Sequence, residues 1–574
     1  MKKILKCTKK YLPIIILTPL VLIVEVILEV NIPKVMSEMV DVGIASGDMS
    51  IVLGYGKKMT IMAILSLAAG MAGTFLSSTG GMGFGSELRK AVFNKIQDFS
   101  FENIDSFQQS SLLTRMTTDV DNVQMGLRMA LTMLIRAPFM MVAAATVAYK
   151  LNSNLFRIFL VAIPVLAIAI VSVSSVSLPM FRYMLTKYDG LNDKAKEYLT
   201  NVRVVKTFVR EDYEKQKFTD INKELLETSI KSESLLCLTG PIMSLVVQSC
   251  IIAVYYLGGM DVMNKLMGKG ELMAFVSYIG QILIGLLMVA MIIMNVVRMK
   301  SSVERISEVL NCESSIVDGD YPGEVEASDI EMRNVTFRYA SASKDALKDI
   351  NLHIKAGETV GIIGSTGCGK TSLVQLIPRL YDANEGEVLV GGRNVKEYKL
   401  DTLRDAVAMV LQQNVLFSGT IKENMRWGNK FATDEEIKEA CKQAQADDFI
   451  MAFPDGYDTY LGQGGVNVSG GQKQRLCIAR ALLKKPKIII LDDSTSAVDT
   501  HTDMMIRTAL KQQLKGTTTL IIAQRIASVM DADRVIVINN GKIDAIDTPA
   551  NLLENNEIYR DIYTTQMKGV EADA

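Results

Sequence analysis

A glycine-rich segment in the second half of the chain has the spacing of a phosphate-binding loop. It reads Gly364-Ser365-Thr366-Gly367-Cys368-Gly369-Lys370-Thr371 and fits the pattern G-x-x-x-x-G-K-[ST]. An apolar run at residues 359–363 precedes it, and a helical run begins at Ser372. Glycine lets backbone N–H groups approach phosphates, and the start of a helix adds positive potential. The pattern predicts that Lys370 reaches the β- and γ-phosphates of a nucleotide and that the Thr371 hydroxyl binds Mg²⁺.

Two later segments carry polar groups that also suit a nucleotide. Residues 488–491 are Ile-Ile-Ile-Leu, a buried strand by composition, and Asp492 follows them. A carboxylate at the end of such a strand can hold Mg²⁺ through water. The turn Ser469-Gly470-Gly471-Gln472 precedes a helical run at residues 473–485. A serine hydroxyl, bare glycine backbone and a helix N-terminus together make an anion site, so this turn is a second candidate for contacting phosphate.

These residues need an α/β domain to position them, and the sequence predicts one. The composition changes near residue 300, where charged helical sequence leads into a segment that contains Pro322 and two glycines. From Ile330 onward, short β-rich runs alternate with helical runs, as in α/β domains. We therefore predict a linker over residues 311–328 and a nucleotide-binding domain over residues 329–574.

The motifs and their order resemble those of the ABC ATPases, whose signature is a Ser-Gly-Gly-Gln turn at the start of a helix. The resemblance extends from the first apolar stretch to about residue 560. It implies ATP and Mg²⁺ as cofactors, with residues 469–472 of one subunit capping the nucleotide on the phosphate-binding loop of another. It also implies that Tyr339 stacks on adenine and that Gln412 contacts Mg²⁺ and the membrane domain. Residues 496–499 resemble the D-loop, and residues 112–124 and 201–211 resemble the two coupling helices.

Three positions depart from the family pattern. The residue after Asp492 is usually a glutamate that acts as general base, but here it is Asp493. Its side chain is one methylene shorter, and misplacement by ~1.5 Å can cost on the order of 10²-fold in rate. The histidine that usually touches the γ-phosphate is replaced by Gln524, whose amide can donate a hydrogen bond but carries no charge. Gln463 stands where a glutamate is common before the signature. The resemblance thus implies a weakened site at this chain's own loop, with Asp493, Gln524 and Gln412 as its catalytic residues.

The first half of the chain is predicted to lie in a membrane. Hydrophobic residues make up 49% of the chain and the mean hydropathy is +0.22, as expected when a polar domain is joined to an apolar one. Six apolar stretches each approach the ~20 residues that a spanning helix needs. They lie at about residues 12–32, 59–79, 129–149, 155–177, 235–258 and 272–296. Together with the resemblance, they predict an α plus α/β architecture: a six-helix exporter-type transmembrane domain over residues 1–310, followed by the P-loop domain.

Charge asymmetry predicts the orientation of these spans. Five lysines precede the first span, and the connections at about 80–128 and 178–234 are long and rich in Lys and Arg. The connections at about 150–154 and 259–271 are short and nearly neutral. Because basic loops stay on the cytoplasmic side, both termini are predicted to be cytosolic, with the protein in the inner (cytoplasmic) membrane. Residues 194–231 contain no Pro or Gly and are predicted to form a helix that extends the spans into the cytosol.

Glu25 and Glu29 are four residues apart in the first span and therefore share one helix face. One interpretation is a site for cationic substrates that faces a cavity. The other is that Glu29 lies near the outer surface and that Glu25 pairs with an arginine from another span. The sequence leaves both interpretations open.

Composition excludes several other classes of function. The formal net charge is −1, so no global field draws the chain to nucleic acid. A soluble, DNA-associated ATPase of the same family is also excluded by the six apolar stretches. The chain has 2 histidines, so a histidine-based zinc site is not expected. Its 7 cysteines form no CxxC pair and fit reduced thiols better than a disulfide framework.

The predicted function is ATP-driven export of amphipathic small molecules, of multidrug type, across a lipid bilayer. A weakened phosphate-binding loop beside an intact signature resembles one subunit of the heterodimeric bacterial multidrug exporters. The expected partner is therefore a second ABC half-transporter with a competent loop. A homodimer with tolerated substitutions is the alternative. Lipid or peptide export, and a regulatory or ATP-gated channel subunit, also remain open.

Overall fold

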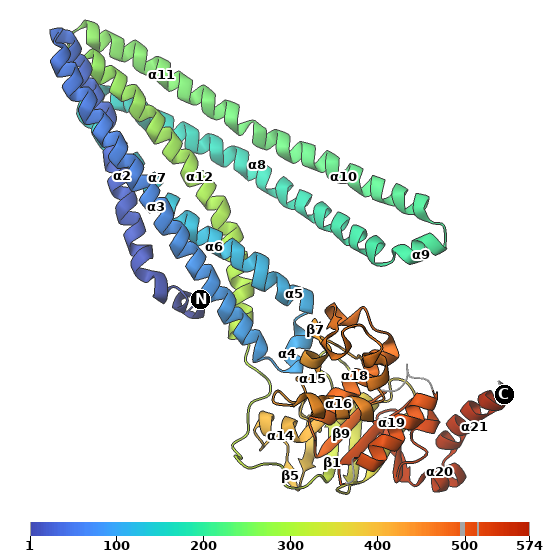
Figure 1. Cartoon of the computed structure of the whole chain (residues 1–574). Helices are drawn as coiled ribbons and strands as arrows, with labels where there is room; N and C mark the ends of the chain where they lie inside the picture. Colours follow the sequence, from blue (N-terminus) through green and yellow to red (C-terminus); the bar gives the residue numbers. More distant parts are fainter. Residues whose placement is uncertain (1, 494–499, 514–515, 573–574) are drawn as a thin grey trace. The chain divides into compact units, whose positions relative to one another are not determined.

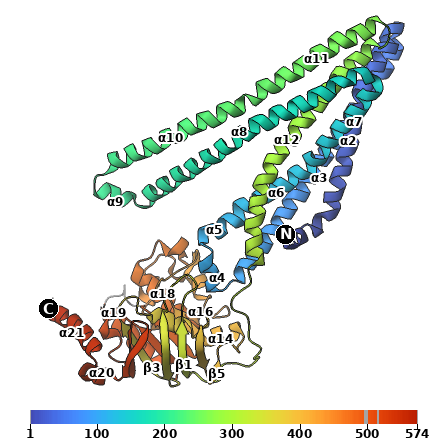
Figure 2. The same cartoon turned by 180° about the vertical axis from the view of Figure 1, so that it is seen from behind.

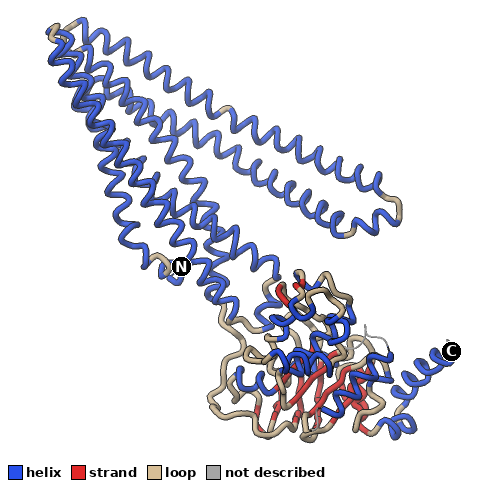
Figure 3. Tube along the Cα trace, in the orientation of Figure 1, coloured by secondary structure: helices blue, strands red, loops and turns tan. Residues whose placement is uncertain are grey.

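The computed structural model describes residues 2–493, 500–513 and 516–572. Its internal contacts divide the chain into two compact units. Unit 1 comprises Met1–Ile96 and Ser110–Asn311, and unit 2 comprises Gln97–Gln109 and Cys312–Ala574. Figure 3 distinguishes helix from strand by colour, and all of the described strands belong to unit 2. The chain is therefore a helical unit followed by an α/β unit that also takes in one short upstream segment.

Unit 2 is built on a six-stranded sheet in the order β12-β11-β3-β10-β9-β6. Its strands are β3 (Thr359–Gly364), β6 (Val407–Val410), β9 (Ile488–Asp492), β10 (Thr518–Ile522), β11 (Arg534–Asn539) and β12 (Lys542–Asp547). Successive residues of β9 enter different hydrophobic clusters: Ile490 lies in one and Ile489 in the other. Both faces of the sheet are therefore covered, which explains why its inner strands read as unbroken apolar runs.

A second sheet of four strands, in the order β2-β1-β4-β5, belongs to the same unit. Its strands are β1 (Ile330–Phe337), β2 (Leu347–Ile354), β4 (Glu385–Val390) and β5 (Arg393–Asn394), and a short pair β7 (Gly419–Thr420) and β8 (Tyr460–Leu461) lies apart from it. The helices of the unit include α13 (Lys370–Gln375), α14 (Leu400–Ala406), α15 (Ile421–Met425), α16 (Asp434–Gln443), α17 (Asp447–Met451), α18 (Gly470–Leu483), α19 (Thr500–Gln513), α20 (Pro549–Asn555) and α21 (Glu557–Ala572). The α/β domain predicted from the alternation of runs is present.

One short helix from before residue 110 packs into unit 2. α4 (Phe101–Ser106) is capped by Ser100, and the Ser100 hydroxyl shares a hydrogen bond of 2.7 Å with the Ser315 hydroxyl. Asp105 of the same helix accepts a hydrogen bond of 2.6 Å from the Tyr381 hydroxyl. α4 lies just upstream of residues 112–124, which resemble the first coupling helix. It is therefore the part of this connection that the α/β unit holds.

Unit 1 is helical, and several of its helices are long (Figure 1). They are α1 (Lys2–Lys6), α2 (Leu12–Glu38), α3 (Met49–Gln97), α5 (Gln109–Thr114), α6 (Val120–Met129), α7 (Ile135–Leu151), α8 (Ser153–Thr200), α9 (Val202–Thr207), α10 (Glu211–Cys237), α11 (Thr239–Met263) and α12 (Lys269–Asn311). Short π-helical turns, η3 (Arg115–Asp119) and η4 (Ala130–Leu134), join α5 to α6 and α6 to α7. Each predicted apolar stretch thus falls in helical backbone.

Five helical segments among the described residues are long and apolar enough to cross a membrane. They are Lys9–Ile44, Met49–Gln97, Gln109–Leu151, Ser153–Thr200 and Gly240–Met263. The sixth predicted span, residues 272–296, lies within α12, but part of its side chains is outside the described set. The count of six spans therefore stays a prediction.

The single cytosolic helix predicted at residues 194–231 is interrupted, so that prediction was wrong. α8 ends at Thr200, the short helix α9 follows, and α10 begins at Glu211. The breaks coincide with Asn201, which has non-helical dihedral angles, and with Val209, which has a φ of 51°. Four valines between residues 202 and 209 lower the helix propensity here, so the chain reverses without Pro or Gly. α8 and α10 consequently lie side by side in both views (Figures 1 and 2).

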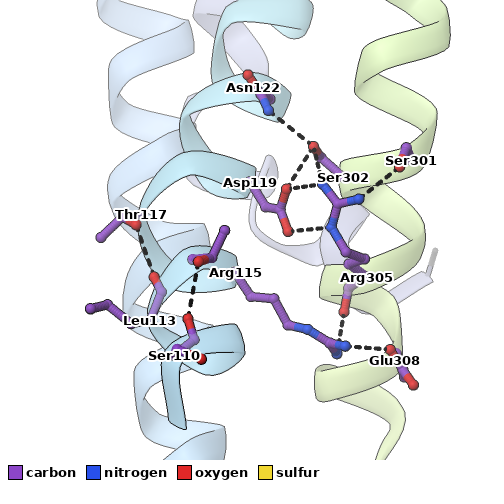
Figure 4. Close-up of polar contacts among 11 residues, drawn as sticks. Ser110, Leu113, Arg115, Thr117, Asp119, Asn122, Ser301, Ser302, Arg305 and Glu308 are labelled. Atoms are coloured by element: carbon purple, nitrogen blue, oxygen red, sulfur yellow. Dashed lines mark hydrogen bonds and ion pairs between the residues drawn. The ribbon is translucent and has the colours of Figure 1, made fainter. Parts of the chain in front are cut away.

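A buried ion pair joins η3 to the C-terminal end of α12 (Figure 4). Asp119 has no exposed surface; it accepts hydrogen bonds from two nitrogens of Arg305, with the Nε contact at 2.7 Å, and from the Ser302 hydroxyl at 2.9 Å. Beside this pair, Arg115 contacts Glu308 at 2.8 Å and donates to the backbone carbonyl of Arg305 at 3.1 Å. The network therefore holds η3 against the C-terminal end of α12 within unit 1.

Replacing Arg305 by alanine is expected to destabilise unit 1, because the Asp119 carboxylate then stays buried without its partner. Breaking a fully buried pair costs about 3–5 kcal/mol, and the exposed share of the Arg305 side chain, 45%, reduces the expected loss to roughly 2 kcal/mol. Thermal unfolding of the purified chain in detergent measures this loss.

The matched control is Lys300→Ala on the same helix. Lys300 is 77% exposed and its contact with Glu304 spans 3.9 Å, so its loss should leave the melting temperature nearly unchanged. Equal decreases in the melting temperature of the two variants would show that the pair of Arg305 with the buried Asp119 contributes no more to stability than the exposed pair of Lys300 with Glu304.

Candidate nucleotide-binding site

Neighbouring parallel strands bring the predicted site residues to one edge of the six-stranded sheet. β3, β10, β9 and β6 are adjacent in this order and run parallel. The register pairs Ile362 with Ile522, Ile522 with Asp492, and Val410 with Leu491. The ends of these strands lead into the phosphate-binding loop, Gln524, Asp493 and Gln412, respectively. Ligands of open α/β sheets bind outside the carboxyl ends of the strands, which makes this edge the candidate nucleotide site.

The phosphate-binding loop depends on its glycines. Gly364, Gly367 and Gly369 have φ angles of 153°, 81° and 105°, a region that other residues rarely adopt. A Cβ atom at Gly364 would lie 2.2 Å from the Ile538 carbonyl oxygen, and one at Gly369 would lie 2.6 Å from that of Ala346. The loop conformation between β3 and α13 is therefore available only to a glycine-rich sequence, as expected for a backbone that surrounds phosphates.

The Lys370 side chain folds back over the loop that precedes it. Its ammonium group donates to the carbonyl oxygens of Gly364 at 2.8 Å and Ser365 at 2.9 Å, and the Cys368 sulfur lies 3.9 Å away. The cation is thus held within the loop rather than in bulk solvent. A phosphate bound there would meet the lysine together with the N–H groups of the loop, the arrangement that the sequence predicts.

Thr371 and Asp492 meet beside the loop. The Thr371 hydroxyl donates to Asp492 Oδ1 at 3.2 Å, whereas Oδ2 of this 2% exposed carboxylate has no hydrogen-bond partner in the described part of the chain. Burial raises the pKa of Asp492, the bond from Thr371 opposes the rise, and the charge of Asp493 adds to it. A buried carboxylate oxygen without a donor is costly unless a cation or water completes it.

These two residues fit Mg²⁺, which prefers oxygen ligands and is often held by one carboxylate together with phosphate oxygens and waters. The Thr371 hydroxyl and Asp492 would hold the ion, and the ion would neutralise charge on the phosphates. Among the described residues, no group of three or more His, Cys, Asp and Glu side chains is placed to bind a metal. A site completed by the nucleotide itself agrees with that finding.

The two residues that are predicted to be catalytic and that depart from the family pattern lie against each other. Gln524 Nε2 donates to Asp493 Oδ2 at 2.9 Å. Asp493 adopts a left-handed φ of 48°, which aspartate tolerates better than most residues, and its backbone N–H donates to the Ile522 carbonyl at 2.9 Å. The substituted carboxylate and the substituted amide therefore form one hydrogen-bonded pair across the ends of β9 and β10.

Tyr339, the predicted adenine platform, is half-buried just after β1. Its hydroxyl donates to Gln375 Oε1 at 3.2 Å and shares a hydrogen bond of 2.9 Å with the Ser372 hydroxyl. Burial raises its pKa. Its ring packs edge-on against Tyr381, with centroids 5.2 Å apart. Tyr381, which the sequence did not reveal, bonds in turn to Asp105 of α4; no motif marks a contact between segments 276 residues apart.

The signature turn begins the 14-residue helix α18. Ser469 Oγ accepts from the Gln472 backbone N–H at 3.3 Å, and Gln472 Oε1 accepts from the Ser469 N–H at 2.8 Å, which forms a capping box. Ser469 and Gly470 are exposed, as is Gln412 after β6. The loop, Thr371, Asp492, Asp493, Gln524 and Gln412 thus lie at one edge of the sheet, and the signature turn is exposed at the start of α18. Residues 496–499, predicted as the D-loop, lie outside the described residues.

Comparison with known proteins identifies the family. Residues 15–287 match the family described as the ABC transporter transmembrane region, and residues 347–496 match the family described as ABC transporter. The Mycobacterium tuberculosis "Uncharacterized ABC transporter ATP-binding protein MT1311" is 37% identical over 550 residues, which cover 95% of this chain and 94% of that protein. The chain belongs to the ABC transporter family. This ABC transporter therefore joins a transmembrane domain to an ATP-binding domain that is an ATPase coupled to transport.

Other relatives of this ABC transporter, and a solved structure, point to export. The Bacillus subtilis "Probable multidrug resistance ABC transporter ATP-binding/permease protein YheI" is 33% identical over 83% of this chain and 82% of that protein. The Syntrophus aciditrophicus "ATP-dependent lipid A-core flippase" is 31% identical over 84% and 80%, respectively. A bacterial Atm1-family ABC exporter with ATP bound has the same fold, with a TM-score of 0.81 over 97% of this chain and 98% of that chain at 23% identity. This ABC transporter is an exporter that lies in the lipid bilayer and crosses it with several helices.

In the membrane half of the exporter, Glu25 and Glu29 both contact Arg136 of α7. The guanidinium nitrogen Nη2 lies 3.1 Å from an oxygen of each carboxylate. Glu25 is only 8% exposed, and a Cβ atom at Gly70 would lie 2.8 Å from its Oε1, so α3 also closes over it. Of the two interpretations of Glu25, the structure has the one in which an arginine from another span pairs with it. The group links α2 to α7 and is not an open cation site.

Replacing Asp492 by asparagine is expected to weaken the binding of MgATP but not of ATP without Mg²⁺. The amide keeps the shape of the carboxylate and removes its charge, whereas Lys370 and the loop remain. The affinity for MgATP should fall about tenfold, the value of one charge-assisted contact, while the affinity measured in EDTA stays within about twofold. Equilibrium binding of labelled ATP to the purified full chain measures both quantities.

Asp405→Asn is the control, because the Asp405 side chain is 85% exposed and lies outside the site. It should change neither affinity. A loss of affinity in the Asp492 variant that is the same with and without Mg²⁺ would show that the orphaned oxygen does not serve a metal.

Proposed function

We propose that this chain is one half of a heterodimeric exporter of amphipathic compounds in the cytoplasmic membrane, with both termini in the cytosol. Six spans from each half enclose the substrate cavity. Each of the two ATP sites combines the phosphate-binding loop of one subunit with the signature turn of the other. ATP binding closes the nucleotide domains and opens the cavity outward, and hydrolysis at the competent site resets the transporter.

The hydrogen bond between Gln524 and Asp493 supports this proposal most strongly. A general base needs a lone pair directed at the attacking water, but Asp493 has a shortened reach and accepts a hydrogen bond from the neighbouring amide. A neutral amide cannot bring positive charge to the γ-phosphate. Because the two substituted side chains form a hydrogen bond with each other, we interpret them as one coordinated change in the role of the site rather than as two independent losses.

The remaining residues of the site suit the binding of ATP. Lys370, Thr371, Asp492 and Gln412 would hold the phosphates and Mg²⁺, and Tyr339 would stack on adenine. Residues 469–472 would cap ATP on the loop of the partner subunit. The exposed position of Ser469 at the start of a 14-residue helix supports that role, because the N-terminus of such a helix attracts anions.

Amphipathic small molecules are the substrates that we favour. The multidrug name of one relative supports this class, and the 33 methionines of the chain suit a cavity that adapts to varied apolar molecules. Lipid export is the second candidate, since another relative is named a lipid A-core flippase. The pairing of Glu25 with Arg136 removes the acidic pair as support for a preference for cations.

Purified without a partner, the chain is expected to hydrolyse ATP slowly, because Asp493 cannot position the attacking water well. The double variant Asp493→Glu and Gln524→His should raise turnover on the order of 10²-fold by restoring reach and charge. Phosphate release by the chain in lipid nanodiscs measures this. Adding Lys370→Ala to the double variant should abolish the gain. Rapid turnover by the unmodified chain alone would refute the heterodimer and favour a homodimer.

Inverted vesicles that contain the chain together with a half-transporter carrying the usual glutamate and histidine are expected to accumulate an amphipathic fluorescent dye when ATP is added. There are two controls. One is the same vesicles without ATP. The other is vesicles in which Lys370 of this chain and the equivalent lysine of the other half are both replaced by alanine. ATP-gated ion conductance without accumulation of dye would instead indicate a channel. ATP-dependent movement of a labelled lipid without movement of dye would indicate a lipid exporter.

A further inference from the structure

The loop that carries Gln524 is held by a side chain from the C-terminal helix. Gln566 of α21 donates through Nε2 to the Gln524 backbone carbonyl at 2.8 Å and accepts through Oε1 from the Ile526 backbone N–H at 2.7 Å. One primary amide thus supplies the two hydrogen bonds that a neighbouring strand would give at residues 524 and 526. We propose that Gln566 is a positioning residue of the nucleotide site, which sets where the Gln524 side chain lies relative to the γ-phosphate of ATP.

The hydrogen bonds of Gln566 lie where the chain passes from the sheet into a turn, in which the Ser528 N–H donates to the Arg525 carbonyl at 3.1 Å. Up to Ala523 the chain follows the sheet, since Ile522 pairs with both neighbouring strands and the Ala523 N–H donates to the Ile362 carbonyl at 3.3 Å. From Ile526 a short 3₁₀ turn begins. Between these points the chain has left the sheet and has not yet entered the turn. The two hydrogen bonds of Gln566 fall at the two ends of this gap, where a rotation of the backbone would move the side chain of Gln524.

The helix that carries Gln566 is anchored independently of it. Tyr559 of α21 is 1% exposed and packs in the buried cluster that contains Ala523, Ile526 and Ile363, the last of which directly precedes the phosphate-binding loop. At the start of the helix, Asn556 accepts from the Tyr559 N–H at 2.8 Å and donates to Asp544 at 2.7 Å. Removing the Gln566 amide should therefore leave α21 in place and release only the loop.

Position matters more for a glutamine at residue 524 than for a histidine. A cation would attract phosphate over several ångströms, whereas a neutral amide contributes only through a hydrogen bond that needs correct distance and direction. The Gln524 amide also donates to Asp493 at 2.9 Å. Gln566 therefore acts through its two backbone hydrogen bonds on both members of the substituted pair. This inference rests on the proposed function, in which residue 524 meets the γ-phosphate.

The variant Gln566→Met tests the inference, since it keeps the length of the side chain and removes both hydrogen bonds. Binding of MgATP and MgADP to the full chain is measured by equilibrium titration. The preference for ATP over ADP should fall about fivefold, the value of one misplaced hydrogen bond to phosphate, while the affinity for ADP stays unchanged. A purely structural role would lower both affinities together.

Two further variants test whether Gln566 acts through Gln524 and which of its two hydrogen bonds is needed. Gln524→Ala should lower the preference for ATP by itself, and Gln566→Met should add nothing in that background. Gln566→Glu keeps the acceptor for the Ile526 N–H but places a carboxylate oxygen against the Gln524 carbonyl. Hydrogen exchange at Ile526 should stay slow in the Glu variant and become faster in the Met variant, while both lose the preference for ATP. The exposed neighbour Thr565→Ala is the control and should change nothing.

If the unmodified chain prefers ATP and Gln566→Met keeps that preference while exchange at Ile526 becomes faster, the inference is overturned and the proposed function stands. A further loss on adding Gln566→Met to Gln524→Ala would also overturn it, because Gln566 would then act by another route. If the unmodified chain does not prefer ATP over ADP, residue 524 does not meet the γ-phosphate, and both the proposed contact and the inference fail.

Discussion

The position of β10 between β3 and β9 is the constraint on which the α/β unit depends. Parallel strands end at the same edge of a sheet, so this order places the phosphate-binding loop, Gln524 and Asp492 within reach of one another. The hydrogen bond from Thr371 to Asp492 crosses over the end of β10, and the bond from Gln524 to Asp493 joins β10 to β9. An order that placed β9 or β10 far from β3 would separate these groups, whatever the motifs around them.

Buried carboxylates mark the difference between scaffold and site in this chain. Asp119 has no exposed surface and receives hydrogen bonds from both Arg305 and Ser302, so its burial stabilises a link between helices. Asp492 is nearly as buried, yet one of its oxygens has no partner among the described residues, and its pKa is raised by that burial. An uncompensated carboxylate lowers stability, which is understandable where a cation brought by the nucleotide completes it.

Sequence predicted those parts of the structure that local patterns determine. The glycines of residues 364–369 indicate a phosphate-binding loop, and an apolar run ending in Asp492 indicates the end of a strand. Both features depend only on neighbours in the chain. The contacts of Tyr381 with Asp105 and of Gln566 with the loop after β10 join distant segments and leave no local pattern. The break near residue 201 was missed for a different reason: the absence of Pro and Gly permits a long helix but does not require one.

Two of the three departures from the family pattern, Asp493 and Gln524, form one hydrogen-bonded pair, and this is the physical case for the proposed divided function. In the proposed function Lys370, Thr371 and Asp492 bind ATP and Mg²⁺, and all three match the family pattern and lie beside one another. Asp493 and Gln524 are the residues proposed to act on the attack of water, and both differ from the family pattern. A site altered in this way keeps the free energy of ATP binding, which favours closure of the nucleotide domains, while it slows the step that ends closure. Loss by random drift would have no reason to spare the first group. In the proposed heterodimer, a site that retains ATP binding without rapid hydrolysis is useful because the other site, formed with a different subunit, supplies the turnover.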